Sequence, residues 1–285
     1  MNKETGELEK QKPLYVFKPE NLGAKMSIDD KALSGEGFTI MSNSKSGKIA
    51  LMLESCKLGE VSSALSLFGS ELKKVESISC DMSPTYLSAL KEQMPWAKRV
   101  IDKFHVMQYV YSAVSEVRLR IKNELSASLS KGKEKTELDK EILIKLDILR
   151  RNRYRLLQSP YEWSEAGKEA MMDLFANHEE LKTAYLLSQR FKSWYDKENC
   201  AKSRNEIIES LNNWYEAIKE SKIKEFITPF KMIRKHENEI INFFISGQTN
   251  AKAERLNGKI NRFIANNYGI RDKDFVLFRI NGYFS

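Results

Sequence analysis

The sequence predicts an α/β protein whose mixed sheet is interrupted by a large all-helical insertion. Residues 25–104 alternate between strand and helix patterns, and residues 105–245 show helical apolar spacing with almost no glycine. Residues 246–285 return to one amphipathic helix that would complete the first part. Residues 1–24 are charged and turn-rich, and we interpret them as an N-terminal arm.

The first strands are predicted by alternation of apolar and polar residues. This alternation covers residues 25–29 and 38–41, and a turn at residues 44–47 leads into a third strand at 48–53. Apolar residues then recur at helical spacing over residues 59–74. The sequence therefore predicts three strands followed by a helix.

Two further strands end at aspartates. Residues 75–80 are predicted to form a strand that ends at Asp81, and residues 99–101 a shorter strand that ends at Asp102. Between them, Ser83 is a helix cap and Pro84 occupies the first helical position. The order is completed by a strand, a helix and a strand.

The remaining chain is predicted to be helical. Leucines recur at heptad-like spacing within residues 105–245, as at Leu143, Leu146 and Leu149. Residues 246–250 are predicted to form a turn that ends in an Asn cap at Asn250, followed by the late helix.

Composition excludes several classes of protein. The chain of 285 residues is 41% hydrophobic and 10% aromatic, enough to bury a core, and no apolar run is long enough for a membrane span. The three cysteines, Cys56, Cys80 and Cys200, are too scattered for a disulfide framework or a zinc cluster. We expect a cytoplasmic protein without a membrane partner.

The charge suggests a polyanionic partner. The net charge is +8, and residues 241–285 are the most basic part per residue. A local stripe of arginines surrounds Tyr154 and consists of Arg150, Arg151, Arg153 and Arg155. This stripe is either a nucleic-acid contact or a solvated helix face.

Three carboxylates lie where a metal site would require them. Asp29 ends the first strand, Asp81 ends the fourth, and Glu254 lies in the first turn of the late helix. Ligands collect at the carboxyl ends of strands in open α/β sheets, and close carboxylates need a hard cation such as Mg²⁺. Taken singly, each residue also fits an ordinary role, as a turn acid or as a first-turn acid.

A match of motifs goes further. Residues 75–106 closely resemble the core of the ISL-three family of insertion-sequence transposases, and further matches carry the resemblance over about residues 25–284. Its motifs are Asp81-Met82-Ser83, Tyr86, Pro95-Trp96-Ala97, Val100-Ile101, Asp102-Lys103-Phe104-His105-Val106, Thr249-Asn250-Ala251, Glu254, Leu256-Asn257, Gly269-Ile270-Arg271 and Phe278-Arg279-Ile280. The segment Ile28-Asp29-Asp30 resembles the opening Ile-Asp-Glu of the family, with Asp30 in place of glutamate.

The resemblance implies a ribonuclease-H-like fold and a DDE-type DNA transposase. Its metal triad would be Asp29, Asp81 and Glu254, holding two Mg²⁺ ions that Mn²⁺ would replace, for cleavage and strand transfer of DNA. The implied partners are the transposon ends and the target DNA, bound by a homodimer associated with a prokaryotic nucleoid.

Other residues gain expected roles from this resemblance. Lys252, Arg255, Lys259 and Arg262 flank Glu254 and hold phosphates, or else form a solvated face. Asp102 and His105 resemble the Asp-x-x-His signature of Mutator-like transposases, and we expect a hydrogen-bonded junction pair rather than a metal site. Trp163, Trp194 and Trp214 are expected in the core, although one of them could stack on an unpaired base.

One departure from the family affects DNA recognition. Family members carry an N-terminal zinc-binding segment and a helix-turn-helix region, and this sequence has no such cysteines ahead of its first strand. We expect a truncated element or one half of a split transposase, with a separate zinc-finger and helix-turn-helix chain as partner. The alternatives are a nuclease without transfer activity and an inactive DNA-binding remnant.

Overall fold

The computed structural model describes residues 14–33, 35–130, 136–246, 251–266 and 273–285. The chain divides into two compact units. The first comprises Met1–His105 and Asn238–Ser285, and the second comprises Val106–Glu237. The sequence predicts an insertion up to residue 245, but residues 238–245 belong to the sheet-containing unit, because Asn242 Nδ2 donates to Arg99 O at 2.9 Å.

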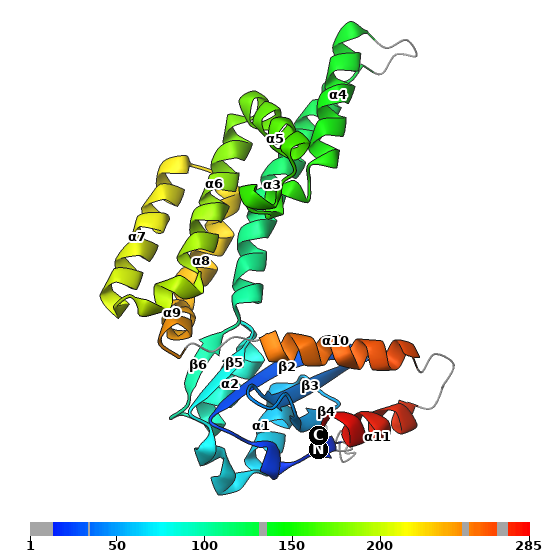
Figure 1. Ribbon diagram of the computed structural model, residues 1–285, viewed down its shortest axis with the longest axis vertical. Coiled ribbons are helices and arrows are strands. Elements are labelled where there is room, and N and C mark those ends of the chain that lie inside the picture. The colour runs from blue at the N-terminus through cyan, green and yellow to red at the C-terminus, as the bar shows by residue number, and fades with distance from the viewer. Residues whose placement is uncertain (1–13, 34, 131–135, 247–250, 267–272) are drawn as a thin grey trace, which may run out of the picture. The chain divides into compact units, whose positions relative to one another are not determined.

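The first unit is built on a mixed sheet. Its order in the described residues is β1-β4-β3-β2-β5-β6 (Figure 1). The strands are β1 (Leu14–Phe17), β2 (Lys25–Leu33), β3 (Glu36–Asn43), β4 (Ile49–Leu53), β5 (Ser77–Cys80) and β6 (Lys98–Ile101). Strands β1, β4, β3 and β2 pair antiparallel, whereas β2, β5 and β6 run parallel. The two parallel pairings end at the same edge, at Ser27–Ser79 and at Cys80–Ile101.

Two features of the sheet differ from the sequence prediction. Strand β1 lies inside the predicted arm of residues 1–24; only Val16 is fully buried there, so this edge strand shows no sustained alternation. Asp29 does not end its strand, because β2 continues to Leu33 by pairing with β3 down to Glu36.

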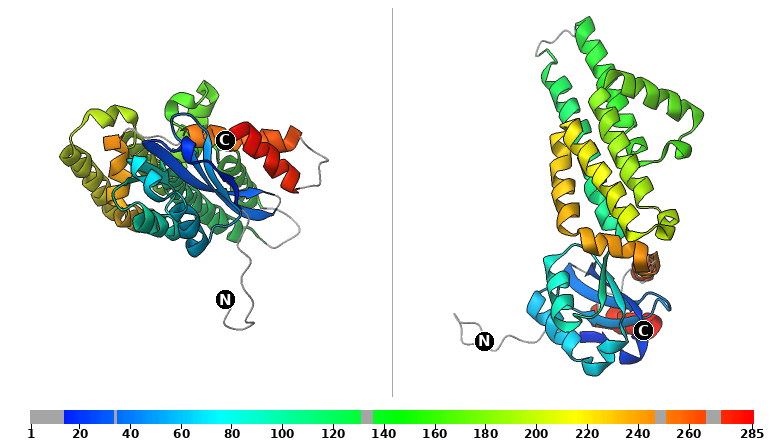
Figure 2. Two further views of the ribbon diagram at one scale, coloured as in Figure 1. Left: turned by 90° about the horizontal axis from the view of Figure 1, so that it is seen from below. Right: turned by 90° about the vertical axis from the view of Figure 1, so that its left-hand side faces the viewer.

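Helices cover both faces of this sheet. One face carries α1 (Leu58–Ser66) and α2 (Pro84–Gln93), and the other carries α10 (Ala251–Asn266) and α11 (Lys273–Phe284), as Figures 1 and 2 show. The predicted helix at 59–74 is divided: after α1 a 3₁₀ helix, η2 (Gly69–Lys74), follows, and Gly69 has φ +52°.

The late segment supplies two helices rather than one. Leu256 and Ile260 of α10 and Leu277 and Ile280 of α11 are all buried at 4% exposure or less. They join one hydrophobic cluster with the sheet residues Val16, Leu33, Phe38, Ile40, Ile49 and Met52. Packing against the sheet therefore fixes which face of α10 looks inward. The predicted cap at Asn250 lies outside the described residues.

The second unit is helical throughout its described residues. Its α-helices are α3 (Lys103–Ala127), α4 (Glu137–Arg151), α5 (Glu165–Asn177), α6 (Glu179–Trp194), α7 (Arg204–Ser221) and α8 (Ile227–Lys235), and residues 103–105 of α3 belong to the first unit. Helix α9 (Glu237–Ser246) belongs to the first unit apart from Glu237. Arg120 of α3 links three elements through ion pairs with Glu124, Glu180 and Glu225.

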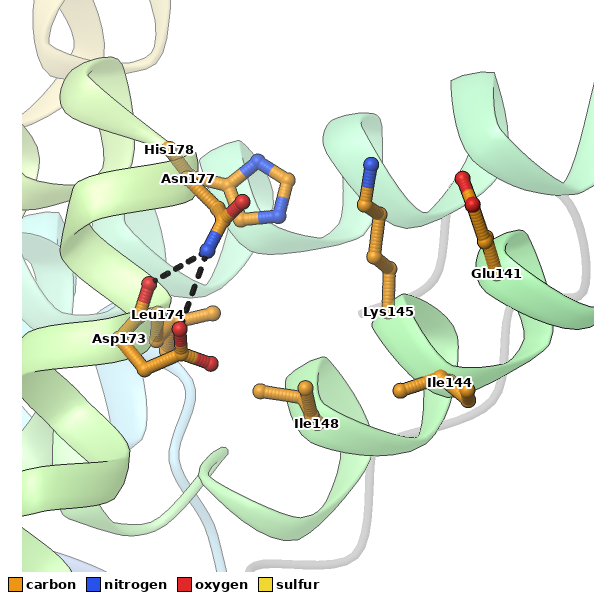
Figure 3. Close-up of a pocket in the computed structure, with 8 residues that line it drawn as sticks. All are labelled: Glu141, Ile144, Lys145, Ile148, Asp173, Leu174, Asn177 and His178. Carbon is orange, nitrogen blue, oxygen red and sulfur yellow. Dashed lines mark hydrogen bonds between the residues drawn. The ribbon is translucent and has the colours of Figure 1, made fainter. Parts of the chain in front are cut away.

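A pocket of about 230 Å³ lies between α4 and α5 of this unit. Ile144 and Ile148 of α4 and Leu174 of α5 give it an apolar wall (Figure 3). Its charged rim has both signs, since Lys145 is accompanied by Glu141 and Asp173. The pocket therefore offers no selectivity for an anionic ligand.

Candidate active site

Three aspartates form a row across β2, β5 and β6. The register pairs Ser27 with Ser79 and Ser79 with Val100. Two residues later in each segment comes an aspartate, on the same face as its paired predecessor. These aspartates are Asp29, Asp81 and Asp102. The row lies at the carboxyl ends of the parallel pairings, on the face that α10 covers.

Asp29 occupies the middle of β2 but lies beyond the end of its pairing with β5. Its Oδ1 accepts from the backbone N of Asp30 at 3.0 Å and lies 4.0 Å from His105 Nε2. Its Oδ2 accepts from Nδ2 of Asn257 at 3.1 Å. Contacts with Asp30 and Asn257 therefore hold this carboxylate in place, within a strand that continues to Leu33.

Asp81 follows β5 and prepares the start of α2. Its Oδ1 accepts from the backbone N of Ser83 at 2.8 Å, which closes an Asx turn. Ser83 is the N-cap of α2 and Pro84 its first residue, as the sequence predicts. The Ser83 side chain makes no cap hydrogen bond. Asp81 therefore closes the turn that leads from β5 into α2.

Asp102 and His105 lie at the start of α3. Asp102 is buried, and its Oδ1 accepts from the backbone N of Phe104 at 3.1 Å. The His105 Nε2 atom lies 3.9 Å from Asp102 Oδ2, which is ion-pair distance rather than hydrogen-bond distance. Because His105 is equally close to Asp29, it lies between two carboxylates instead of forming an isolated pair with Asp102.

The electrostatics of this row disfavour its ionised form. Burial raises the pKa of Asp29 to about 6; His105 opposes this rise, and Asp30 and Asp102 add to it. Burial also raises the pKa of Asp81, against the hydrogen bond from Ser83. Carboxylates that are desolvated and crowded together gain most from a bound cation.

Helix α10 is attached to β2 at two points. Asn257 Nδ2 reaches Asp29, and Lys31 Nζ donates to the Asn257 backbone O at 3.3 Å. Residues three apart on a helix share a face, so position 254 is on the face of α10 that carries Asn257. The side chain of Glu254 itself, like that of Lys252, lies outside the described residues.

A comparison with protein families identifies the chain. A family model of ISL-three DDE transposases, described as Transposase, matches residues 26–280. The chain belongs to this transposase family. No curated protein and no solved structure matches it. Membership implies DNA as a partner, and within the described residues no helix of this transposase has the length and apolar character of a membrane span.

The described residues of this transposase contain no group of three or more His, Cys, Asp and Glu side chains arranged to hold a metal ion. Two of the three predicted ligands, Asp29 and Asp81, lie within that part of the chain. Both offer oxygen, which suits a hard cation such as Mg²⁺, and both carry unfavourable charge. The donor chemistry therefore fits the predicted ion.

The arginine stripe is partly neutralised within the chain. Arg150 and Arg151 both pair with Asp147, at 2.8 and 2.5 Å. Arg155 donates to Asn152 at 2.7 Å, and Arg153 stacks 4.5 Å from the ring of Tyr154, which is 64% exposed. Burial lowers the pKa of Arg118, and the like charge of the nearby Arg153 lowers it further.

The basic residues of α10 face solvent where they are described. Arg255, Lys259 and Arg262 are exposed. None of them is in an ion pair with another described residue. Their charges are therefore available to an anion.

The tryptophans of the insertion serve its core. Trp194 and Trp214 are buried, and their indole N–H groups donate to Ile207 O at 3.1 Å and Leu187 O at 2.9 Å. Trp163 is partly buried and donates to Arg155 O at 3.1 Å. The core interpretation is confirmed for Trp194 and Trp214, and neither offers a ring face to a base.

The contact of Asn257 with Asp29 was not among the predicted site contacts. The sequence signal for it is its spacing, one helical turn after Glu254, which places both on one helix face. Only the packing of α10 on the sheet shows that this face meets β2.

Proposed function

We propose that this chain is the catalytic part of a DDE-type DNA transposase of an insertion sequence, with a ribonuclease-H-like core. The observation that carries the proposal is the row that sets Asp29 and Asp81 on one sheet face beneath α10, the helix of Glu254. The sheet order, with an antiparallel hairpin beside parallel strands, supports the proposed fold.

In this proposal Asp29, Asp81 and Glu254 hold two Mg²⁺ ions, or Mn²⁺ in their place. Bound there, the ions would activate the attacking oxygen and neutralise charge on the scissile phosphate. Asn257 fixes the orientation of Asp29 through its 3.1 Å hydrogen bond, and the Ser83 turn fixes Asp81. The exposed cations of α10 hold neighbouring phosphates.

The proposal extends to partners. The substrates would be transposon ends and target DNA, bound by a homodimer, with a separate zinc-finger and helix-turn-helix chain reading the ends. Such a chain would act at the nucleoid of a prokaryotic cytoplasm.

The test is Asp81→Asn. Asparagine keeps an oxygen that can accept from the backbone of Ser83, so the turn and the start of α2 should persist. Mg²⁺-dependent cleavage of a labelled duplex should disappear, while the melting temperature in metal-free buffer stays unchanged or rises, because repulsion in the row is relieved. Glu76→Gln, at an exposed residue just before β5, is the matched control.

The products decide the class of enzyme. Joined strands indicate a transposase, and nicks alone indicate a nuclease without transfer activity. Wild-type cleavage by Asp81→Asn would remove this residue from the site, and a wild-type chain that binds DNA but never cuts it would be an inactive remnant.

A further inference from the structure

A second cavity lies in the first unit, and its charged residues are all basic, unlike those of the pocket between α4 and α5. It measures about 260 Å³ and lies between the β3–β4 turn, α10 and α11. It is lined by Ser46, Gly47, Lys48, Arg255, Leu256, Lys259, Tyr283 and Phe284. Three of these residues are cationic and none is acidic, so the cavity favours an anion.

The three cations come from two elements that converge. Lys48 follows the turn, and Arg255 and Lys259 lie one helical turn apart on α10. All three are exposed, and no ion pair joins them to another described residue. Three like charges around one cavity repel each other, and the attraction of an anion bound between them offsets this repulsion.

The turn that carries Lys48 is held rigidly. Asn43 Oδ1 accepts from the backbone N of Lys45 at 2.8 Å and of Ser46 at 3.0 Å. Gly47 has φ +78°, a left-handed conformation that favours glycine, and its N donates to Asn43 O at 2.8 Å. The turn's backbone donors are used internally, so an anion would be held by side chains.

The cavity also has an apolar side. Of its lining residues, Leu256 is buried, Phe284 is partly buried and Tyr283 is 67% exposed. A phosphodiester presents an anionic group beside a largely apolar deoxyribose, which this combination of surfaces matches.

The place of the cavity relates it to the aspartate row. Asp29 pairs with Ile40, and Asn43 lies three residues further along β3, opposite Met26. Asn43 N donates to Lys48 O, so Lys48 lies level with Asn43 on the β4 side, two strands from β2. At about 3.3 Å per residue and about 4.8 Å per strand the separation from Asp29 is roughly 14 Å. That distance corresponds to about four nucleotides of one DNA strand.

We propose that Lys48, Arg255 and Lys259 form a phosphate-binding pocket for the DNA backbone, a few nucleotides from the scissile bond. The inference rests on the proposed DNA-processing function and adds a contact outside the carboxylate site. The pocket reads no base edges, because its cations contact phosphate, and it therefore fixes the position of the DNA irrespective of sequence.

The experiment is a fluorescence titration of a labelled duplex at several salt concentrations with the whole chain. The variants are the triple change Lys48→Gln, Arg255→Gln and Lys259→Gln, and a control that removes equal charge from the α1–α2 side, Lys57→Gln, Lys73→Gln and Lys91→Gln. The pocket variant should flatten the dependence of log affinity on log salt by about one unit for each phosphate that it no longer binds. The control variant should keep the wild-type slope.

Several results would overturn the inference. They are an unchanged slope in the pocket variant, equal flattening in the control, and a wild-type chain that binds no duplex. Inorganic phosphate that binds the wild-type chain but not the pocket variant, when duplex slopes are equal, would assign the pocket to a free anion.

Cleavage of the same duplex by wild type and by Asp81→Asn is measured separately. Flattening with a wild-type chain that does not cut would support the pocket and overturn the proposed catalysis. Cutting with an unchanged slope would do the reverse.

Discussion

Asn257 is the residue that connects the late helix to the first strand of the site. Its side chain binds Asp29 and its backbone oxygen accepts from Lys31, so α10 cannot rotate without breaking both contacts. Outer partners of metal-ligating carboxylates fix ligand orientation. We therefore regard Asn257 as a positioning residue for the proposed ions.

Asn257→Ala should raise the Mg²⁺ concentration needed for half-maximal cleavage by about 10- to 100-fold, the usual cost of losing such a partner. The reason is that Asp29 loses the hydrogen bond that orients it, while the other two proposed ligands, Asp81 and Glu254, are unchanged. The measurement is cleavage rate against Mg²⁺ concentration.

Asn261→Ala, at an exposed position of the same helix, is the matched control and should leave the Mg²⁺ dependence unchanged. An equal shift in both variants would show a general loss of α10 stability. No shift in Asn257→Ala would exclude the positioning role.

Trp214→Phe should destabilise the chain by about 1–3 kcal/mol, because the buried indole loses its 2.9 Å hydrogen bond to Leu187 O and the smaller ring leaves a cavity. Urea unfolding measures this. Trp96→Phe is the control: Trp96 also donates to a carbonyl, Val75 O, but is 48% exposed, so water can replace the donor. A salt-resistant loss of DNA binding by stable Trp214→Phe would contradict the core role.

The start of α4 depends on one carboxylate. Asp139 accepts from the backbone N and hydroxyl of Ser130 and from those of Thr136, within a capping box. The hydrogen bonds from Ser130, first, and from Thr136 hold the pKa of Asp139 well below its usual range. The folded state therefore binds the proton of Asp139 less readily than the unfolded state.

This lowered pKa makes the stability of the fold depend on pH. A lowered pKa contributes stability that is complete above the unfolded value of about 4 and is lost as pH falls through the folded value. Asp139→Asn should remove this part of the acid destabilisation, so its unfolding free energy should fall less steeply below about pH 4.

Chemical unfolding at a series of pH values is the measurement for this variant. Glu137→Gln, in the same first turn but with a side chain that is 86% exposed, should keep the wild-type pH profile. Identical profiles for wild type and Asp139→Asn would show that the cap does not contribute.

Elements whose ends are marked by turn or cap residues in the sequence could be predicted. The segment Asp81-Met82-Ser83-Pro84 indicates the end of one strand and the start of a helix, and in the structure β5 ends at Cys80 and α2 begins at Pro84. No such signal follows Asp29, because β2 continues past it to Leu33 in its pairing with β3. Asp29 lies at an edge only because the pairing of β2 with β5 ends before it, at Ser27. Strand β1 was not predictable because its burial depends on Met52, far along the chain.

The site contacts show the same limit. That Asp29 and Asp81 share a face depends on strand register, which a local pattern does not contain. The meeting of Asn257 with Asp29 depends on tertiary packing of α10 through Leu256 and Ile260. For the arginine stripe, the sequence shows the positive charges but not that Asp147 pairs with both Arg150 and Arg151.

For the molecule as a whole, we predict sequence-independent DNA binding that weakens steeply with salt. Two unrelated duplexes should bind with equal affinity in fluorescence titrations, because released counterions supply the driving force. Arg153→Gln should flatten the salt dependence by about one unit, and Arg150→Gln by less, because Arg150 shares Asp147 with Arg151. A salt-insensitive preference for one duplex would place end recognition within this chain.

The hydrophobic cluster of the first unit has a consequence for synthesis. Val16 of β1 is buried together with Leu277 and Ile280 of α11, and Asn281 donates to Tyr15 O at 3.1 Å. A ribosome synthesises β1 long before α11, and a domain folds only once all its segments have emerged. We expect an incomplete nascent chain to lack a closed core. The proposed DNA cleavage would then require translation past Ile280, and products that end before α11 should lack it.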